Sequence, residues 1–226
     1  MKLSKEQIAQ IDETLVSNKV VYDDVKLELT DHIASDIEGI MSDKSVSFEE
    51  AFKDAFEKWE RKLVLTSNAG WLGFFVFSPK LVVDKMVSYS KRQMTLIFIS
   101  AFIFGTLMSS LVTIYNNDKF FNILKFGLTS LFLLIGVTTI FLIFLIWKSN
   151  HKTTYGRLFL LRGCLTFSYF YLFNLYNKNQ FLLDASNSFL ENFLAWILYG
   201  FAFFYSFFQI IMAFEHFKTV KKYRLI

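Results

Sequence analysis

The chain has 226 residues, of which 54% are hydrophobic and 29 are phenylalanine. Charged residues make up 19%, compared with about 25% in ordinary soluble domains. Residues 1–66 carry a net charge of −6 and residues 67–226 carry +10, which indicates an acidic soluble module joined to a membrane module with basic flanks. Cations beside apolar segments meet lipid headgroups, so no nucleic-acid partner is predicted. The single cysteine, Cys164, excludes an internal disulfide and a thiolate metal site.

Residues 1–66 are predicted to form a small domain of three amphipathic helices. Ser4 with Gln7, and Ser47 with Glu50, have the spacing of capping boxes at two helix starts. A helix between them is expected over about residues 23–41, with Asp23 and Asp24 at its positive N-terminus. The apolar stripes that would form one core recur at helical spacing. They comprise Leu3, Ile8, Ile11 and Leu15, then Val25, Leu29, Ile33, Ile37, Ile40 and Met41, then Phe48, Phe52, Phe56, Trp59 and Leu63.

The acidic faces of these helices offer a candidate surface for a protein partner. Asp31, Asp36 and Glu38 lie on the second helix, where a basic or amphipathic partner helix could pair with them. Glu28 and His32 fall on the same face as Asp36 at four-residue steps, so they could also offer metal ligands. A solvated polar face explains this spacing more simply, and we predict no metal and no cofactor.

Several stretches of the first 90 residues resemble a family of small helical domains that precede membrane segments in bacterial proteins, known as HAAS or DUF1700-like domains. The resemblance is carried by residues 28–33 (ELTDHI), 37–38 (IE) and 47–52 (SFEEAF). Residues 78–85 (SPKLVVDK) are similar to a segment of uncharacterised four-span proteins of Bacteroidetes. The resemblance implies a membrane-bound regulatory or permease-associated role and implies no catalytic residues.

Residues 67–93 are predicted to form an interfacial amphipathic connector. The apolar run from Gly70 is too short to span a membrane, and Pro79, the only proline, interrupts it. Aromatic residues, lysines and apolar residues then alternate, as is typical of the headgroup zone. A partner groove or a buried loop is the competing interpretation.

Residues 94–226 are predicted to form a four-helix transmembrane bundle with a basic tail. Each expected span is an apolar run close to the 20 or so residues that a bilayer requires. The spans cover residues 94–115, 126–147, 158–176 and 193–214. The fold class is therefore all-α, with a small three-helix domain preceding four spans.

The distribution of Lys and Arg predicts the orientation. Four spans place both termini and the middle loop on one side, which carries 11 of these cations near the membrane, whereas the other side carries 3. By the positive-inside rule, the N- and C-termini are predicted to be cytoplasmic. Together with the resemblance to bacterial proteins, this predicts a multi-pass protein of the bacterial inner (cytoplasmic) membrane.

Ionisable groups within the spans are few, which limits the possible chemistry. Arg162 is the exception, and we expect it to lie near Gln209 or Glu215 of the fourth span, or to reach lipid phosphate. No nucleophile turn, Gly-rich phosphate loop or H-E-x-x-H motif occurs in the sequence. We therefore predict no catalytic residues and no enzyme.

The predicted function is that of a non-catalytic inner-membrane protein whose cytoplasmic helical domain binds a protein partner, in a regulatory or accessory role. Membrane lipid is the other expected partner, and a homo-oligomer is possible. The alternative is an oligomeric transport or pore-forming subunit.

Overall fold

The computed structural model describes residues 2–73, 76–115, 117–163, 165–166 and 188–223. These residues form an all-α protein with one short two-stranded sheet. The chain divides into two compact units. The first, here the helical-domain unit, comprises residues 1–89, 150–157 and 216–226. The second, here the long-helix unit, comprises residues 90–149 and 158–215.

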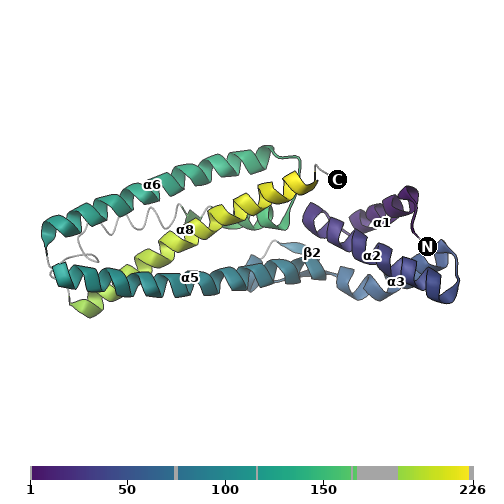
Figure 1. Cartoon of the computed structure of the whole chain (residues 1–226), viewed down its shortest axis with the longest axis horizontal. Coiled ribbons are helices and arrows are strands. Elements are labelled where there is room, and N and C mark those ends of the chain that lie inside the picture. Colours follow the sequence, from purple (N-terminus) through teal and green to yellow (C-terminus); the bar gives the residue numbers. More distant parts are fainter. Residues whose placement is uncertain (1, 74–75, 116, 164, 167–187, 224–226) are drawn as a thin grey trace. The chain divides into compact units, whose positions relative to one another are not determined.

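The three predicted helices of the N-terminal domain are confirmed as α1 (Lys5–Ser17), α2 (Asp23–Lys44) and α3 (Phe48–Leu63). Ser4 and Gln7 form the predicted capping box at the start of α1. Ser47 accepts a hydrogen bond from the backbone N–H of Glu50 at 3.3 Å, which begins α3. The three helices pack together (Figure 1) around a core that takes most of its side chains from the predicted stripes, although Ile8 of the first stripe is exposed. Its buried members include Ile11, Leu15, Leu29, Ile33, Ile37, Ala51, Ala55 and Trp59.

Two short strands pair with one another at the start of the region predicted to form the interfacial connector. Strand β1 (Leu65–Ser67) pairs antiparallel with β2 (Phe77–Pro79), and α4 (Ala69–Leu72) lies between them. Asn68 caps α4 by accepting from the backbone N–H of Trp71 at 3.3 Å. Pro79 occupies the last position of β2, at the end of a strand, where its missing N–H costs no ladder bond.

The second half of the connector is continuous with the first predicted span. Helix α5 runs from Lys80 to Tyr115 without a break at residue 93. No Pro or Gly falls between Lys80 and Phe104, so nothing in the local sequence stops the helix where its composition changes from basic to apolar. A boundary drawn from hydropathy thus marks a change of surroundings within one helix.

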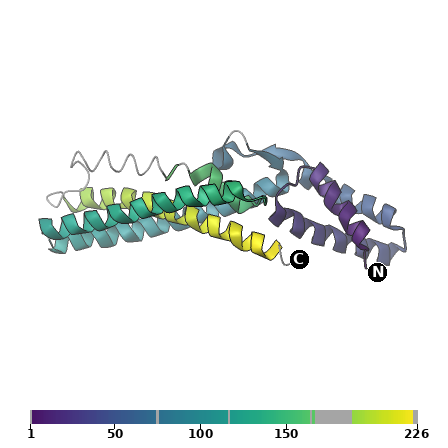
Figure 2. The same ribbon diagram turned by 90° about the horizontal axis from the view of Figure 1, so that it is seen from above.

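Among the described residues, three helices are long and apolar enough to cross a membrane. They are α5, α6 (Asp118–Lys148) and α8 (Phe189–Tyr223), which run alongside one another in both views (Figures 1 and 2). These helices contain the first, second and fourth predicted spans. Helical structure also covers residues 154–163 and 165–166, at the start of the third predicted span. The remainder of that span lies outside the described residues.

Close approach of α5 and α8 forms the centre of the long-helix unit. A Cβ at Gly105 would lie 2.5 Å from Cγ1 of Ile197, and one at Gly200 would lie 3.3 Å from Cα of Ala101. Small residues therefore let the two backbones meet, as is common between membrane helices. A cluster of aromatic and apolar side chains packs beside this contact, including Met108, Phe121, Phe132, Trp196 and Tyr199.

The outer faces of the long helices are apolar and exposed. Phe98 and Phe102 of α5 are 60% and 59% exposed, and Phe126 of α6 is 75% exposed. An exposed apolar surface of this extent is unfavourable in water and favourable against lipid. The arrangement accordingly supports membrane insertion of this unit.

Candidate functional site

The apolar face of α3 is only partly used by the core of the three-helix domain. Trp59 and Leu63 are buried, whereas Phe52 and Phe56 remain half-exposed. The centroids of these two rings lie 4.5 Å apart. They form part of a hollow of about 680 Å³, here the aromatic groove, whose polar residues include Glu57 and Glu60. It is lined by Thr14, Asn18, Phe52, Lys53, Phe56, Glu57, Glu60 and Leu63.

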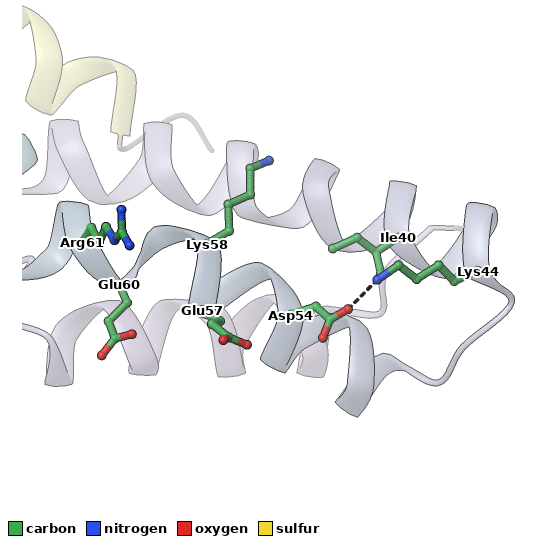
Figure 3. Close-up of a pocket in the computed structure, with 7 residues that line it drawn as sticks. All are labelled: Ile40, Lys44, Asp54, Glu57, Lys58, Glu60 and Arg61. Atoms are coloured by element: carbon green, nitrogen blue, oxygen red, sulfur yellow. Dashed lines mark hydrogen bonds and ion pairs between the residues drawn. The ribbon is translucent and has the colours of Figure 1, made fainter.

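A second hollow lies over α2 and α3 and has a different character (Figure 3). Lys44 Nζ donates to Asp54 Oδ2 across it at 2.7 Å, and this pairing raises the pKa of Lys44. Charges of both signs surround the hollow, and Ile40 is the only apolar residue in its lining. A mixed, open surface of this kind suits water better than a specific ligand, so it is not a candidate site.

The three acids of the predicted partner surface have different surroundings. Asp31 is exposed. Asp36 Oδ2 accepts from Lys58 Nζ and from Trp59 Nε1, each at 3.0 Å. Glu38 Oε1 accepts from the backbone N–H of Leu3 at 2.9 Å. Two of the three therefore hold the domain together, and their role toward a partner stays a prediction.

The surroundings of Asp36 also change its pKa. Burial by itself raises the pKa, but the hydrogen bonds from Trp59 and Lys58 outweigh it, so the net pKa lies below its ordinary value. The carboxylate is thus ionised when it joins α2 to α3.

Two of the three side chains considered as metal ligands are paired with lysines. Glu28 Oε2 accepts from Lys85 Nζ at 2.6 Å, and Asp36 pairs with Lys58 as described. In the part of the chain that the structure describes, no group of three His, Cys, Asp or Glu side chains could hold a metal ion.

The N-terminus of α2 contacts the segment that follows α6. These contacts, made by Asp23 and Asp24, are here called the acidic clasp. Asp23 Oδ2 lies 3.0 Å from His151 Nδ1 and accepts from the backbone N–H of Lys152 at 3.3 Å. The backbone N–H of Asp23 donates to Lys152 O at 2.7 Å. Asp24 accepts from both the backbone N–H and the hydroxyl of Thr154. The carboxylate of Asp24 therefore caps the helix that begins at Thr154, where the helix dipole favours a negative charge.

Neighbouring side chains support the clasp from α5. Lys85 Nζ lies 3.9 Å from Asp24 Oδ2 while it pairs with Glu28. The rings of Tyr89 and Tyr155 stack with centroids 4.9 Å apart, and their hydroxyls are 3.0 Å apart. Burial and the bond to Tyr89 raise the pKa of Tyr155, so this hydroxyl is protonated at neutral pH.

The C-terminal end of α8 also contacts the segment that follows α6. His216 Nδ1 lies 2.8 Å from Thr153 Oγ1, which also accepts from the backbone N–H of Gly156 at 3.0 Å. A Cβ at Gly156 would lie 2.8 Å from His216 Nδ1, so only glycine fits there without a shift. His216 is buried at 1% exposure.

Sequence reasoning noticed Asp23 and Asp24 but missed their partners. The adjacent acids and the Thr-Thr pair before a helix were visible signals. The bonds, however, join residues 128 to 130 positions apart, and no local pattern shows such a pairing.

Within the long-helix unit, Arg162 contacts a residue that the sequence did not single out. Its Nη1 donates to Gln93 Oε1 of α5 at 3.4 Å. Gln93 directly precedes the first predicted span. Gln209 is fully buried, and Glu215 is half-buried. The predicted proximity of Arg162 to these two residues stays a prediction.

Comparisons with family models, with curated proteins and with solved structures found no match to this chain. The resemblance of the first 90 residues to HAAS domains therefore stays a prediction. The aromatic groove, the acidic clasp and the buried polar residues around Arg162 are the features from which function has to be argued.

Proposed function

We propose that this chain is a non-catalytic, multi-pass protein of the bacterial inner membrane, whose cytoplasmic helical domain binds a protein partner in a regulatory or accessory role. The proposal includes four spans and cytoplasmic termini. Three long apolar helices with exposed apolar faces support the membrane location, and the excess of Lys and Arg on one side supports the orientation. The HAAS-like residues of α2 and α3 favour the regulatory role.

The observation that carries partner binding is the aromatic groove. Phe52 and Phe56 lie beside one another and are half-exposed. Burying aromatic rings is a main source of stability for a small domain, so leaving these two rings exposed to water is unfavourable unless another surface covers them. Aromatic side chains in a hollow with a charged rim are typical of the anchor sites of protein interfaces.

The shape and charge of the groove favour an amphipathic helix with basic residues as the partner. The apolar face of such a helix would cover Phe52 and Phe56, as in other helix-in-groove complexes. Its cations would approach Glu57 and Glu60 at the rim. Rim charges of this kind control the association rate and its salt dependence more than the final affinity.

The acidic clasp offers a way for partner binding to affect the long helices. Because α2 bonds directly to residues 151–154, a partner that shifts α2 would shift the segment between α6 and the next helix. The helical domain would then regulate the long helices in addition to binding the partner.

A photo-crosslinking amino acid at Phe56 of the full-length protein, in its native membrane, tests partner binding. The matched control is the same amino acid at Ile8, an exposed apolar residue of α1. We expect one dominant crosslinked protein at Phe56 that carries a basic amphipathic helix. Reversing Glu57 and Glu60 to Lys should weaken this crosslink most strongly at low salt. Equal labelling at the two positions would contradict the proposal.

Reporter fusions test the orientation separately. Fusions after residue 151 and after residue 214 should report a cytoplasmic location, and fusions near residues 118 and 178 a periplasmic one. A periplasmic signal at residue 151 would reject the four-span topology.

A transport or pore-forming subunit is the second candidate, and the buried polar residues of the long-helix unit favour it. Gln93 is buried at 4% exposure just before the first predicted span, and Gln209 is buried at 0% exposure within the fourth. Polar groups inside a membrane bundle commonly mark a solute path. A ring-shaped oligomer with a water-filled axis, together with a phenotype that survives changes to Phe52 and Phe56, would replace the partner-binding proposal.

A further inference from the structure

A buried histidine lies where the end of α8 meets the segment that follows α6. His216 Nδ1 is 2.8 Å from Thr153 Oγ1, and a Cβ added at Gly156 would lie 2.8 Å from the same ring nitrogen. Thr153 Oγ1 also accepts from the backbone N–H of Gly156, and Thr153 O accepts from that of Arg157, each at 3.0 Å. His216, Thr153 and Gly156 are here called the histidine latch, and all three belong to the helical-domain unit.

Titratable and charged groups from several elements surround the latch. They are Glu215 and Lys218 beside His216 on α8, His151 on the same segment as Thr153, Asp23 and Asp24 on α2, and Lys85 on α5. Asp23 Oδ2 lies 3.0 Å from His151 Nδ1, and Asp24 Oδ2 lies 3.9 Å from Lys85 Nζ. Both carboxylates therefore already have a basic partner other than His216.

A positive charge on His216 is unfavourable while the latch is closed. The side chain is fully buried and Gly156 packs against it, so hydrating the ring requires the end of α8 to separate from residues 153–156. Burial lowers the pKa of His216 below its ordinary value and the neighbouring His151 lowers it further, whereas the opposing effect of Asp24 and Asp23 is smaller. The closed latch thus favours the neutral imidazole.

We propose that the histidine latch is an acid-sensitive switch, which releases the end of α8 from residues 153–156 while the acidic clasp keeps that segment on α2. This goes beyond the proposed partner binding and does not depend on it. Protonation affects the two histidines in opposite ways. A charge on His216 has to leave a buried site, whereas a charge on His151 strengthens its pair with Asp23.

The closed latch is favoured at neutral and higher pH. Because the pKa of His216 is lower in the closed latch than in the open one, the closed latch loses stability as pH falls below the ordinary histidine value of about 6.5. Linkage of one proton limits this loss to about tenfold in the ratio of closed to open latch for each pH unit below that value.

Hydrogen exchange of the full-length protein in detergent tests the switch between about pH 7.5 and about pH 5.5, a window that stays above the ordinary range of carboxylates. The backbone N–H groups of Gly156 and Arg157 are the reporters, and each rate is divided by the intrinsic rate at that pH. We expect their protection to fall severalfold at the lower pH, and by no more than about tenfold.

A second amide of the wild type shows whether the release is selective. The backbone N–H of Asp23 donates to Lys152 O at 2.7 Å and should keep its protection at the lower pH, because the acidic clasp stays closed. Unchanged protection at Gly156 and Arg157, or an equal loss at Asp23, would show that the inference is wrong. This comparison needs no variant, so it remains decisive if a substitution at His216 prevents folding.

Asparagine variants identify the histidine that responds. His216→Asn keeps a polar group beside Thr153 but takes up no proton, so its protection at Gly156 should be the same at both pH values. His32→Asn is the matched control and should respond as the wild type does, because His32 is exposed on α2. His151→Asn should weaken the response without abolishing it, since His151 lowers the pKa of His216. A response that persists in His216→Asn would overturn the assignment of the switch to this residue.

Discussion

The helical-domain unit and the long-helix unit are both helical, but different interactions hold them together. In the first, charged side chains join distant segments in addition to the apolar core, as Asp24 does with Thr154 and Lys85 does with Glu28. In the second, small residues let α5 and α8 approach closely, and aromatic rings fill the space beside them. The difference follows from the surroundings of each unit. Ion pairs and charged hydrogen bonds are common at a surface in contact with water. Close van der Waals packing still stabilises helices where no hydrophobic force acts between them.

The largest effect is expected where the two backbones of the long-helix unit meet. Gly105→Leu would force a side chain into Ile197, whose Cγ1 lies 2.5 Å from the position of the new Cβ. Overpacking of this kind costs about 3 kcal/mol. The measurement is the loss of the folded fraction on heating in detergent, followed by tryptophan fluorescence.

Gly136→Leu is the matched control for that change. A Cβ at Gly136 meets nothing within 4 Å, so the same added volume should have little effect. Equal destabilisation by both changes would contradict the close-packing account, because helix propensity by itself favours Leu over Gly at both positions.

The acidic clasp should show the next largest effect. Asp24→Ala leaves the backbone N–H of Thr154 without its acceptor, and a hydrogen bond to a charged group contributes about 2 kcal/mol. We expect faster hydrogen exchange at Thr154 and faster tryptic cleavage after Lys152. Asp43→Ala, at an exposed acid of the same helix, is the control and should change neither rate.

The loss of stability on breaking the link between α2 and α3 should be smaller and should depend on pH. Asp36→Asn removes a charge that accepts from Lys58 and Trp59, at a site only partly shielded from water, so the loss at neutral pH is about 1 kcal/mol. Because the folded-state pKa of Asp36 lies below its ordinary value, the wild-type advantage is present at higher pH and is lost as pH falls through the folded-state pKa.

Denaturant titrations of Asp36→Asn and of the wild type at several pH values would measure this difference. Asp31→Asn serves as the control, because Asp31 is exposed on the same helix. A stability difference that grows as pH falls would have the wrong sign for this account.

The smallest effect is expected for the pair across the open hollow of Figure 3. Lys44 and Asp54 have side chains that are 59% and 47% exposed. Water and salt screen such a pair, so Asp54→Ala should leave the unfolding midpoint unchanged within error, especially at high salt. A clear loss of stability would mean that the charge network over α2 and α3 acts cooperatively.

Local sequence patterns predicted the N-terminal domain well. Capping residues such as Ser4 and Ser47 and stripes at helical spacing identified α1, α2 and α3, because both signals depend on residues within one or two turns. The same reasoning assigned Phe52 and Phe56 to the core stripe, whereas both are half-exposed in the structure. Whether an aromatic side chain of a stripe enters the core depends on how the neighbouring helix crosses it.

Hydropathy was informative for the apolar parts of the long helices but did not show where each helix begins. It located the apolar parts of α5, α6 and α8, since the length of an apolar run is a property of the sequence alone. It did not show that α5 begins at Lys80, because a helix continues through a change of polarity when no residue breaks it. The hairpin of β1 and β2 was also missed, since its strands are only three residues long.

The amino-acid sequence by itself determined the helical class, the three helices of the N-terminal domain and the apolar character of the long helices. Each of these depends on residue types and on spacing within a few turns. Only the tertiary structure decided that Asp24 caps the helix at Thr154, that Arg162 contacts Gln93 and that Gly105 meets Ile197. Those contacts join residues that are 130, 69 and 92 positions apart. Such pairings depend on how whole helices pack, which no local pattern of residues encodes.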